Sequence, residues 1–326
     1  MAKILVTGGA GYIGSHTVQF LLRAGHDVTV ADSLVRGFAH NVPPGLLRQV
    51  DLTDTPSLIP LLAGVDAVIH FAAYIAVGES TKLPELHFWN NSAGSISLLN
   101  AMAQTGVSKI VFSSTAAVYG TVDVSPLPET LPMAPENPYG ESKATVERIL
   151  DWMDRCRGIR SVRLRYFNAC GAEPGLGIGE EHDPETHLIP LIFRAIESGK
   201  PITVFGNDYP TLDGTCIRDY VHVSDLATAH LAALNWLSSG GATGAYNCGT
   251  GHGHSVLEVI RAVEEATGRT VPYVVGPRRE GDPARLVADS TRLKTQLGWT
   301  PRYTELREIV RTAWEFEQLR LARRSA

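Results

Sequence analysis

A tyrosine and a lysine four residues apart are the side chains of this 326-residue chain best suited to acid–base chemistry. Tyr139 and Lys143 follow Asn137 and Pro138, which are typical of a helix N-cap and first helical position. Residues i and i+4 of a helix share one face. A phenol has a pKa of about 10, and a nearby ammonium can supply much of the roughly 4 kcal/mol that lowers it toward 7. We expect a catalytic tyrosine tuned by a lysine.

A hydroxyl group that could work with this pair comes at the end of an apolar run. Ser113, Ser114 and Thr115 close the strand predicted over residues 109–114. Ligands of parallel α/β sheets bind at the carboxyl ends of the strands. Thr115 could therefore hold a substrate oxygen while Tyr139 removes its proton. Taken alone, a Tyr-x-x-x-Lys pattern is more often a pair on a helix surface. The glycine-rich strand–turn–helix near the N-terminus and the Ser/Thr strand end that precede this one favour a catalytic pair.

A glycine-rich turn near the N-terminus predicts a dinucleotide site. Gly8, Gly11 and Gly14 follow the first predicted strand and open the first helix, where a backbone without side chains can approach a pyrophosphate. Asp32 ends the second strand and can accept a hydrogen bond from a ribose hydroxyl, which favours NAD over NADP. Arg36 is close enough in sequence to accept a 2′-phosphate, so NADP stays open. A strand–helix turn without a ligand is the plain alternative.

The order of elements around these residues is that of a doubly wound α/β fold. Apolar, β-branched runs alternate with helical patterns, as in βαβ units. The strands are predicted over residues 4–7, 28–32, 47–50, 67–71, 109–114 and 162–166, and the longest helices over 15–23, 84–104 and 138–155. We expect a Rossmann-like parallel sheet over residues 1–167, to which some later segments return, and a smaller C-terminal α/β lobe over 168–326 that binds the substrate.

Composition sets the class of partner. The net charge of −5 and the pI of about 6.1 give no reason to expect nucleic acid or an anionic membrane. The first apolar run is too short for a signal peptide, and the longest apolar runs are too short for a membrane span. The four cysteines are widely spaced, as reduced thiols are. The sequence predicts a cytoplasmic enzyme that acts on small molecules.

Several blocks resemble the extended short-chain dehydrogenase/reductase family, and within it the nucleotide-sugar epimerases. They span the chain: Thr7–Gly14, His70–Ala73, Ala76–Ser80, Tyr139–Lys143, Arg165–Asn168 and, most specific of all, Phe205–Val223. The resemblance implies NAD that stays bound and interconversion of UDP-glucose and UDP-galactose by transient oxidation at sugar carbon 4. Tyr139 would act as base and then as acid, beside the positive nicotinamide. The family often forms homodimers through the 84–104 and 138–155 helices, so a homodimer is expected.

The resemblance also assigns roles to individual residues. Cofactor contacts would come from Gly8, Gly11, Tyr12, Ile13, Gly14, Asp32, Ser33, Asp51, Leu52, Phe71, Ala72, Ala73, Asn90, Ser113, Tyr139, Lys143 and Tyr166. Asp51 would bond the adenine amino group, although such an aspartate equally often caps a turn. The UDP-sugar would be held by Thr115, Tyr139, Asn168, His187, Leu188, Thr203, Val204, Phe205, Arg218, Arg279 and Asp282.

Departures from the family pattern limit the type of reaction but do not identify the sugar of the substrate. Ala116 and Ala117 stand where related dehydratases and decarboxylases carry an acidic residue, which argues against elimination chemistry. Leu286 lies near a position where, in the family, a bulky side chain restricts 2-acetamido sugars and a small one admits them. Leucine is intermediate in size, so N-acetylated substrates stay undecided. Other UDP-sugar 4-epimerases and a nucleotide-sugar reductase remain alternatives. His182, Asp183, Glu185 and His187 resemble metal ligands, but they lie in a segment without preset geometry, so no metal is expected.

Overall fold

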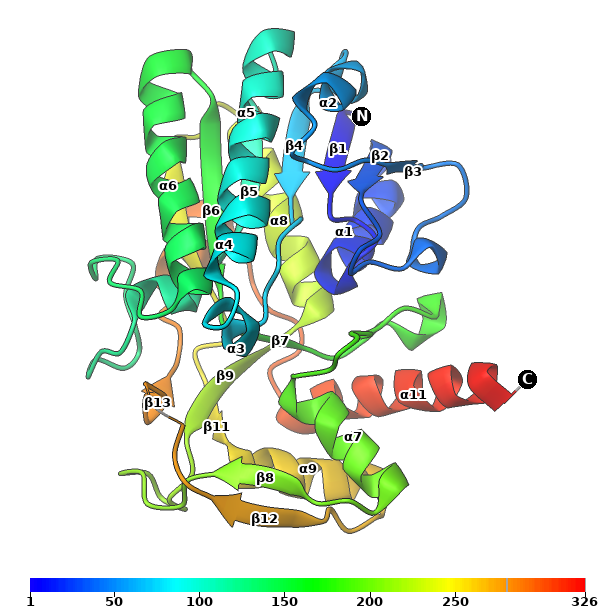
Figure 1. Ribbon diagram of the computed structural model, residues 1–326, viewed down its shortest axis with the longest axis vertical. Helices are drawn as coiled ribbons and strands as arrows, with labels where there is room; N and C mark the ends of the chain where they lie inside the picture. The colour runs from blue at the N-terminus through cyan, green and yellow to red at the C-terminus, as the bar shows by residue number, and fades with distance from the viewer. Residues whose placement is uncertain (280, 326) are drawn as a thin grey trace.

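A seven-stranded parallel sheet forms the larger part of the molecule. The computed structural model describes residues 1–279 and 281–325. The strands run in the order β10-β6-β5-β4-β1-β2-β3 (Figure 1). Their bounds are β1 (Lys3–Thr7), β2 (Asp27–Asp32), β3 (Leu47–Gln49), β4 (Ala67–His70), β5 (Lys109–Thr115), β6 (Arg160–Tyr166) and β10 (Gly244–Cys248). The strand order reverses between β1 and β4, and this switch point is where doubly wound sheets bind ligands.

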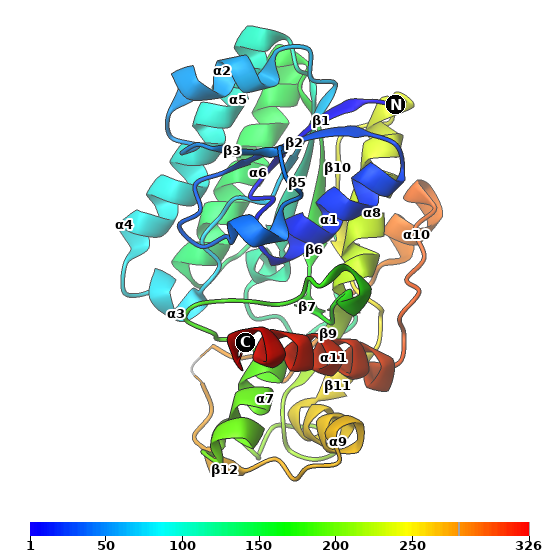
Figure 2. The same ribbon diagram turned by 90° about the vertical axis from the view of Figure 1, so that its right-hand side faces the viewer.

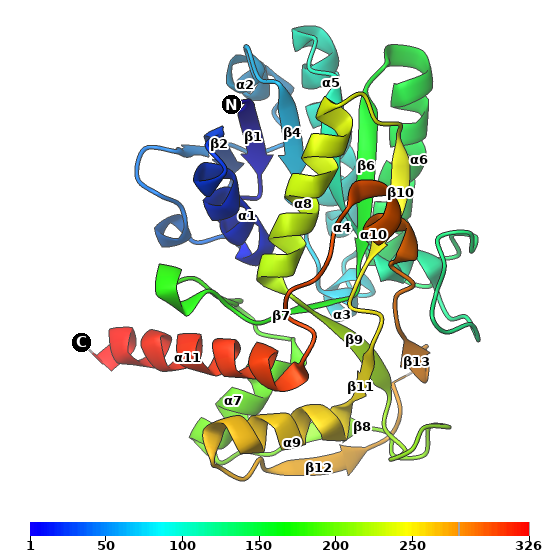
Figure 3. The ribbon, with the colours of Figure 1, turned by 180° about the vertical axis from the view of Figure 1, so that it is seen from behind.

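Helices cover both faces of this sheet. On one face lie α2 (Thr55–Leu62), α5 (Gly94–Thr105) and α6 (Pro138–Arg157). On the other lie α1 (Tyr12–Arg23) and α8 (Val223–Ser238), with α10 (Thr291–Leu297) beside β10 (Figure 3). Burial on both faces explains why the central strands read as continuous apolar runs rather than as alternating patterns.

The predicted doubly wound fold is confirmed, and all six predicted strands are present with slightly different ends. The seventh strand, β10, was missed because its sequence, GAYNC, has no β-branched residue. The segment expected as a helix over 84–104 is helical throughout, but it is not α-helical throughout. It consists of α4 (Pro84–His87), a π-helical turn (Phe88–Ala93) and α5. In that turn Asn91 bonds both the N–H and the carbonyl of Tyr74 and the Ser142 hydroxyl, which accounts for the wider backbone.

A smaller lobe lies beyond the carboxyl ends of the large sheet (Figure 2). It contains β7 (Asn168–Cys170), β9 (Ile217–His222), β11 (Gly253–Ser255) and β13 (Arg285–Leu286) in one sheet, and β8 (Ile202–Phe205) paired with β12 (Tyr273–Gly276). Its core is covered by α7 (Leu188–Ser198), α9 (Val256–Thr267) and α11 (Leu306–Ser325). Between β9 and β11 the chain returns to the large sheet as α8 and β10.

Short helical segments complete the described chain: α3 (Val77–Ser80) and 3-10 turns at Ala39–Asn41, Ala116–Tyr119 and Pro174–Leu176. Among the helices in the described part of the chain, none combines the length and the apolar character that crossing a membrane requires.

Candidate active site

The glycine turn between β1 and α1 leaves an open backbone cradle at the switch point. A Cβ on Gly8, where φ is +71°, would lie 2.4 Å from the Ala72 nitrogen, and one on Gly14 would lie 2.2 Å from the Gly8 carbonyl oxygen. These two glycines are therefore required by backbone packing. A Cβ on Gly11 would approach only the Gly8 oxygen, at 3.4 Å, among the described residues. No side chain caps α1, so its first N–H groups are free to meet a pyrophosphate.

Asp32 closes this cradle from the end of β2. Its carboxylate accepts hydrogen bonds from the N–H groups of Ala10 (3.0 Å) and Leu34 (2.9 Å), which fix it beside the turn. Burial raises the pKa of Asp32, although the two backbone bonds oppose that effect. Arg36, which left NADP open, donates to Glu79 at 2.7 Å and to the Asp183 carbonyl at 3.3 Å. The arginine thus has protein partners of its own, which favours NAD.

The other predicted cofactor residues surround the same edge of the sheet. Phe71 follows directly after β4, and its ring centroid lies 4.5 Å from that of His230. Asn90 lies in the π-helical turn and donates to the Asn91 side chain. Tyr166 is buried at the end of β6, where its hydroxyl bonds His230. Asp51 is exposed and accepts both the N–H and the hydroxyl of Thr53 at 2.8 Å, so in this structure it caps a turn.

Tyr139 and Lys143 lie on α6 as predicted, facing the end of β5. The Asn137 side chain accepts the Gly140 N–H at 2.9 Å, which confirms the predicted N-cap. The Thr115 side chain lies close enough to the Tyr139 hydroxyl to favour its phenolate form. Lys143 donates from Nζ to the Ser113 carbonyl at 2.8 Å, and is almost fully buried. The tertiary structure therefore brings together the three residues predicted to do the chemistry.

Burial shifts the pKa values of Tyr139 and Lys143 in opposite directions. Burial raises the pKa of Tyr139 to about 12, and the Thr115 side chain only partly offsets this. Burial lowers the pKa of Lys143 to about 7, against the attraction of Glu147. Lys143 is directed at the Ser113 carbonyl and does not by itself bring the pKa of Tyr139 near neutrality, in keeping with the expectation that the positive nicotinamide provides the remainder. The tyrosine needs a further positive charge.

A buried polar network behind the trio was missed by the sequence analysis. Glu147, one turn after Lys143 on α6, accepts the Ser114 hydroxyl and three hydrogen bonds from Arg165. Arg165 also donates to the Tyr119 hydroxyl at 2.9 Å, and Tyr119 in turn donates to Asn247. A glutamate four residues beyond the lysine on an otherwise apolar face was the available signal.

The residues predicted to bind the nucleotide part of the substrate gather in the smaller lobe. Arg218 on β9 forms an ion pair with Asp282, and the Arg279 guanidinium lies 4.0 Å from the centre of the Phe205 ring. Asn168 on β7 and Leu188 at the start of α7 line a small cavity with His187. Thr203 is exposed on β8.

Two residues of this lobe have surroundings that limit their roles. The Val204 side chain is buried in the lobe's core, so only its backbone can contact a ligand; strand alternation turns Thr203 and Phe205 the other way. Leu286 on β13 packs against the apolar cluster that contains Ala116 and Phe167. It therefore packs against the same apolar cluster as the residue that follows Thr115.

These features together define a protein of the short-chain dehydrogenase/reductase class: a parallel sheet, a glycine turn and an acidic residue at its switch point, and a Tyr–Lys pair facing a strand-end hydroxyl. A family model described as "NAD dependent epimerase/dehydratase family" matches residues 4–249. The chain belongs to this family, and NAD is its cofactor. The open glycine cradle and the carboxylate of Asp32 fit that group.

Relatives with assigned names cover almost the whole chain. A UDP-glucose 4-epimerase of Lacticaseibacillus casei is 47% identical over 319 residues, which are 97% of this chain and 96% of the relative. The crystal structure of UDP-glucose 4-epimerase from Brucella ovis in complex with NAD has a TM-score of 0.93 at 42% identity, covering 96% and 97% of the two chains. The enzyme from Stenotrophomonas maltophila, solved with NAD and formylated UDP-arabinopyranose, has a TM-score of 0.94 at 42% identity over both full chains.

Proposed function

We propose that this chain interconverts UDP-glucose and UDP-galactose, with Tyr139 as the base and acid at the sugar 4-hydroxyl. The observation that carries the proposal is the placement of Tyr139, at the start of α6, beside Thr115 at the carboxyl end of β5. The name shared by relatives that match nearly the full chain supports the substrate assignment.

The residues of the trio have complementary tasks. When bound, NAD would supply the acceptor for the hydride of sugar carbon 4, and its positive nicotinamide would supply the charge that favours the Tyr139 phenolate. Tyr139 takes the 4-hydroxyl proton, and Thr115 holds the oxygen in line by a second hydrogen bond. Lys143, held by the Ser113 carbonyl, places its amino group on the same face of α6 as Tyr139. After the keto sugar turns over, the same phenol returns the proton, so one group serves both directions.

The smaller lobe carries side chains suited to hold the nucleotide diphosphate of the substrate in place. Arg218 and Arg279 present guanidinium groups suited to diphosphate oxygens, and Asp282 is placed beside Arg218 to accept from a ribose hydroxyl. Anchoring the nucleotide leaves the sugar as the freely turning part. Ala116 and Ala117 follow Thr115. Because neither side chain is an acid or a base, neither can transfer the second proton that elimination requires, which supports epimerisation over dehydration.

The decisive experiment is to incubate the purified protein with UDP-galactose, without added reductant, and to follow UDP-glucose by chromatography. We expect both sugars to reach equilibrium. Turnover of UDP-pentoses or UDP-hexuronates alone would reject the hexose assignment and retain the epimerase. If the purified protein carries no NAD and consumes added NADH when a keto sugar is supplied, the enzyme is instead a reductase.

A homodimer is the assembly that the surface supports. Large apolar side chains stay exposed on the stretch from α4 to α5 and on α6, which lie side by side (Figure 1): Phe88, Trp89, Ile96 and Trp152. Exposed apolar side chains concentrated on neighbouring helices are typical of a subunit interface. We infer that these helices pair with those of a second copy. Sedimentation at micromolar concentration should give twice the chain mass of 35.2 kDa, and a mass of one chain would reject the dimer.

A further inference from the structure

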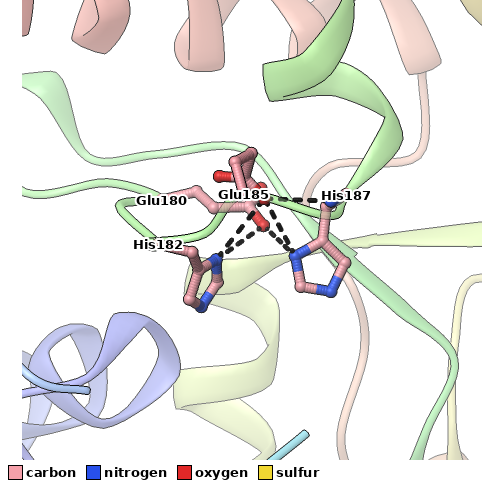
Figure 4. Close-up of side chains that lie close together, drawn as sticks. All are labelled: Glu180, His182, Glu185 and His187. Carbon is pink, nitrogen blue, oxygen red and sulfur yellow. Dashed lines mark hydrogen bonds and ion pairs between the residues drawn. The ribbon is translucent and has the colours of Figure 1, made fainter. Parts of the chain in front are cut away.

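Four side chains with metal-binding atoms converge in the segment between β7 and α7. They are Glu180, His182, Glu185 and His187, and one ligand atom from each lies within 4.8 Å of the others. Figure 4 shows the two imidazoles on either side of the carboxylates, with their Nδ1 atoms turned toward them. The His182 ring packs edge-on against Tyr12 at the start of α1, with centroids 6.1 Å apart, so the cluster lies where the lobe meets the large sheet.

The separations suit a four-coordinate ion. Nδ1 of His182 lies 3.4 Å from Oε1 of Glu180 and 3.8 Å from Oε1 of Glu185, and Nδ1 of His187 lies 3.6 Å from Oε1 of Glu185. Ligands held tetrahedrally at zinc distances are about 3.4 Å apart. The His187–Glu180 pair, at 2.6 Å, must widen by less than about 1 Å. The His187 side chain is 40% exposed, so it has room to move and opens a path for the ion.

Hydrogen-bond geometry gives a second, independent indication. Oε1 of Glu180 and Nδ1 of both histidines are buried, yet none of them makes a hydrogen bond of normal geometry. The Glu180 side chain is only 8% exposed. Buried polar atoms are nearly always hydrogen-bonded. The close approaches without bonding angles mean that these atoms point at a shared centre rather than at one another.

We propose that Glu180, His182, Glu185 and His187 bind a divalent transition-metal ion of the zinc type. Two imidazole nitrogens and two carboxylate oxygens suit such an ion, and the two carboxylates neutralise its charge. Because all four ligands come from the protein, the site is structural. The ion would join both ends of the 180–187 segment immediately before Leu188 and α7. This proposal does not depend on the sugar substrate, and it departs from the sequence expectation that no metal binds.

The competing account is a pair of ion pairs in which both imidazoles are protonated, and metal titration separates the two. The full-length, metal-free protein should bind one equivalent of Co²⁺, with the intense visible absorption of a four-coordinate site, and Zn²⁺ should displace it. His182→Asn and Glu180→Gln should each weaken binding by at least about tenfold. Thermal melts establish that both variants are folded, and affinity is compared only for folded protein.

His254→Asn is the matched control, because it removes a histidine from another His–Glu pair, with Glu258 at 4.0 Å. It should leave metal affinity unchanged. A titration of wild-type protein that shows no saturation at one equivalent would overturn the proposal in favour of the ion pairs. Wild-type affinity in both folded ligand variants would overturn it equally, because the metal would then lie elsewhere.

Discussion

Arg165 on β6 and Glu147 on α6 form a buried, two-armed ion pair behind the proposed catalytic residues, Tyr139 and Lys143. Arg165 donates from Nε at 2.9 and 3.3 Å and from Nη2 at 2.6 Å to the two carboxylate oxygens. The same carboxylate accepts the Ser114 hydroxyl on β5. The pair therefore ties the helix that carries Tyr139 and Lys143 to the two strands beneath it. We infer that it fixes the position of α6 relative to Thr115.

Glu147→Gln should be strongly destabilising. The substitution leaves Arg165 buried without its counter-charge, and breaking a buried pair costs about 3–5 kcal/mol. Urea denaturation, followed by circular dichroism, measures the loss. The control on the same helix is Glu141→Gln, which removes the exposed ion pair with Arg148 and should cost about 1 kcal/mol or less. Equal effects of the two substitutions would contradict the role given to Glu147.

Stability should fall in mild acid because buried histidines stay neutral in the folded protein. Burial lowers the pKa of His70 to about 3 and that of His230 to about 4. The unfolded chain protonates at about 6.5, so it binds more protons than the folded protein between these values. Each buried histidine makes its full contribution to the free energy of unfolding above pH 6.5, and this contribution is lost as pH falls toward 4. By pH 5 the loss is about 2 kcal/mol per histidine.

The check is the unfolding free energy measured at several pH values from 7 to 5. His70→Gln should flatten this dependence by the share of one histidine, whatever its effect at pH 7. His252→Gln, which alters an exposed side chain, is the control. An unchanged slope in His70→Gln would mean that His70 takes up its proton in the folded state too.

Tyr139→Phe should keep NAD but lose turnover. The phenyl ring fills the same space, whereas proton transfer contributes about 10²- to 10⁴-fold to rate. Bound NAD is measured by its absorbance after denaturation, and kcat with UDP-galactose. Tyr273→Phe, at an exposed site on β12, should behave as wild type. A Tyr139→Phe enzyme with near-normal kcat would remove Tyr139 from its proposed role.

Arg218→Lys should weaken substrate binding more than chemistry. A lysine keeps the charge but cannot present the planar fork that fits diphosphate oxygens and Asp282. Loss of a charge-assisted hydrogen bond corresponds to about a 10- to 100-fold rise in KM, with kcat changing much less. Arg261→Lys, whose side chain is 63% exposed, is the control. If kcat falls and KM does not, Arg218 acts on the reacting sugar instead.

Leu286 should control the size of the sugar. Because it packs against the cluster that contains Ala116, a larger side chain would project toward the sugar end of the site. We expect Leu286→Tyr to lower kcat/KM for UDP-N-acetylglucosamine relative to UDP-glucose, and Leu286→Ala to raise that ratio. The ratio is measured on one preparation of each variant. If the ratio of kcat/KM values is unchanged in both variants, the 2-substituent of the sugar does not contact Leu286.

Local patterns in the sequence determined the fold class and most of the chemistry. The first strand, the glycine turn and Asp32 belong to a single βαβ unit, and Tyr139 and Lys143 share a helix, so short-range geometry sets how each group is arranged. The N-cap at Asn137 is confirmed for the same reason. Strand β10 and the π-helical turn escaped prediction, because pairing with β6 and bonds from Asn91 to Tyr74 and Ser142 impose them.

Only the tertiary structure decided the electrostatics and the long-range pairs. No spacing in the chain shows that Lys143 is directed at the Ser113 carbonyl, or that burial raises rather than lowers the pKa of Tyr139. Glu147 and Arg165 are 18 residues apart and meet only when α6 packs on the sheet. Desolvation and ion pairing depend on which atoms surround a charge in space, and that is settled by packing between elements rather than by the pattern within one.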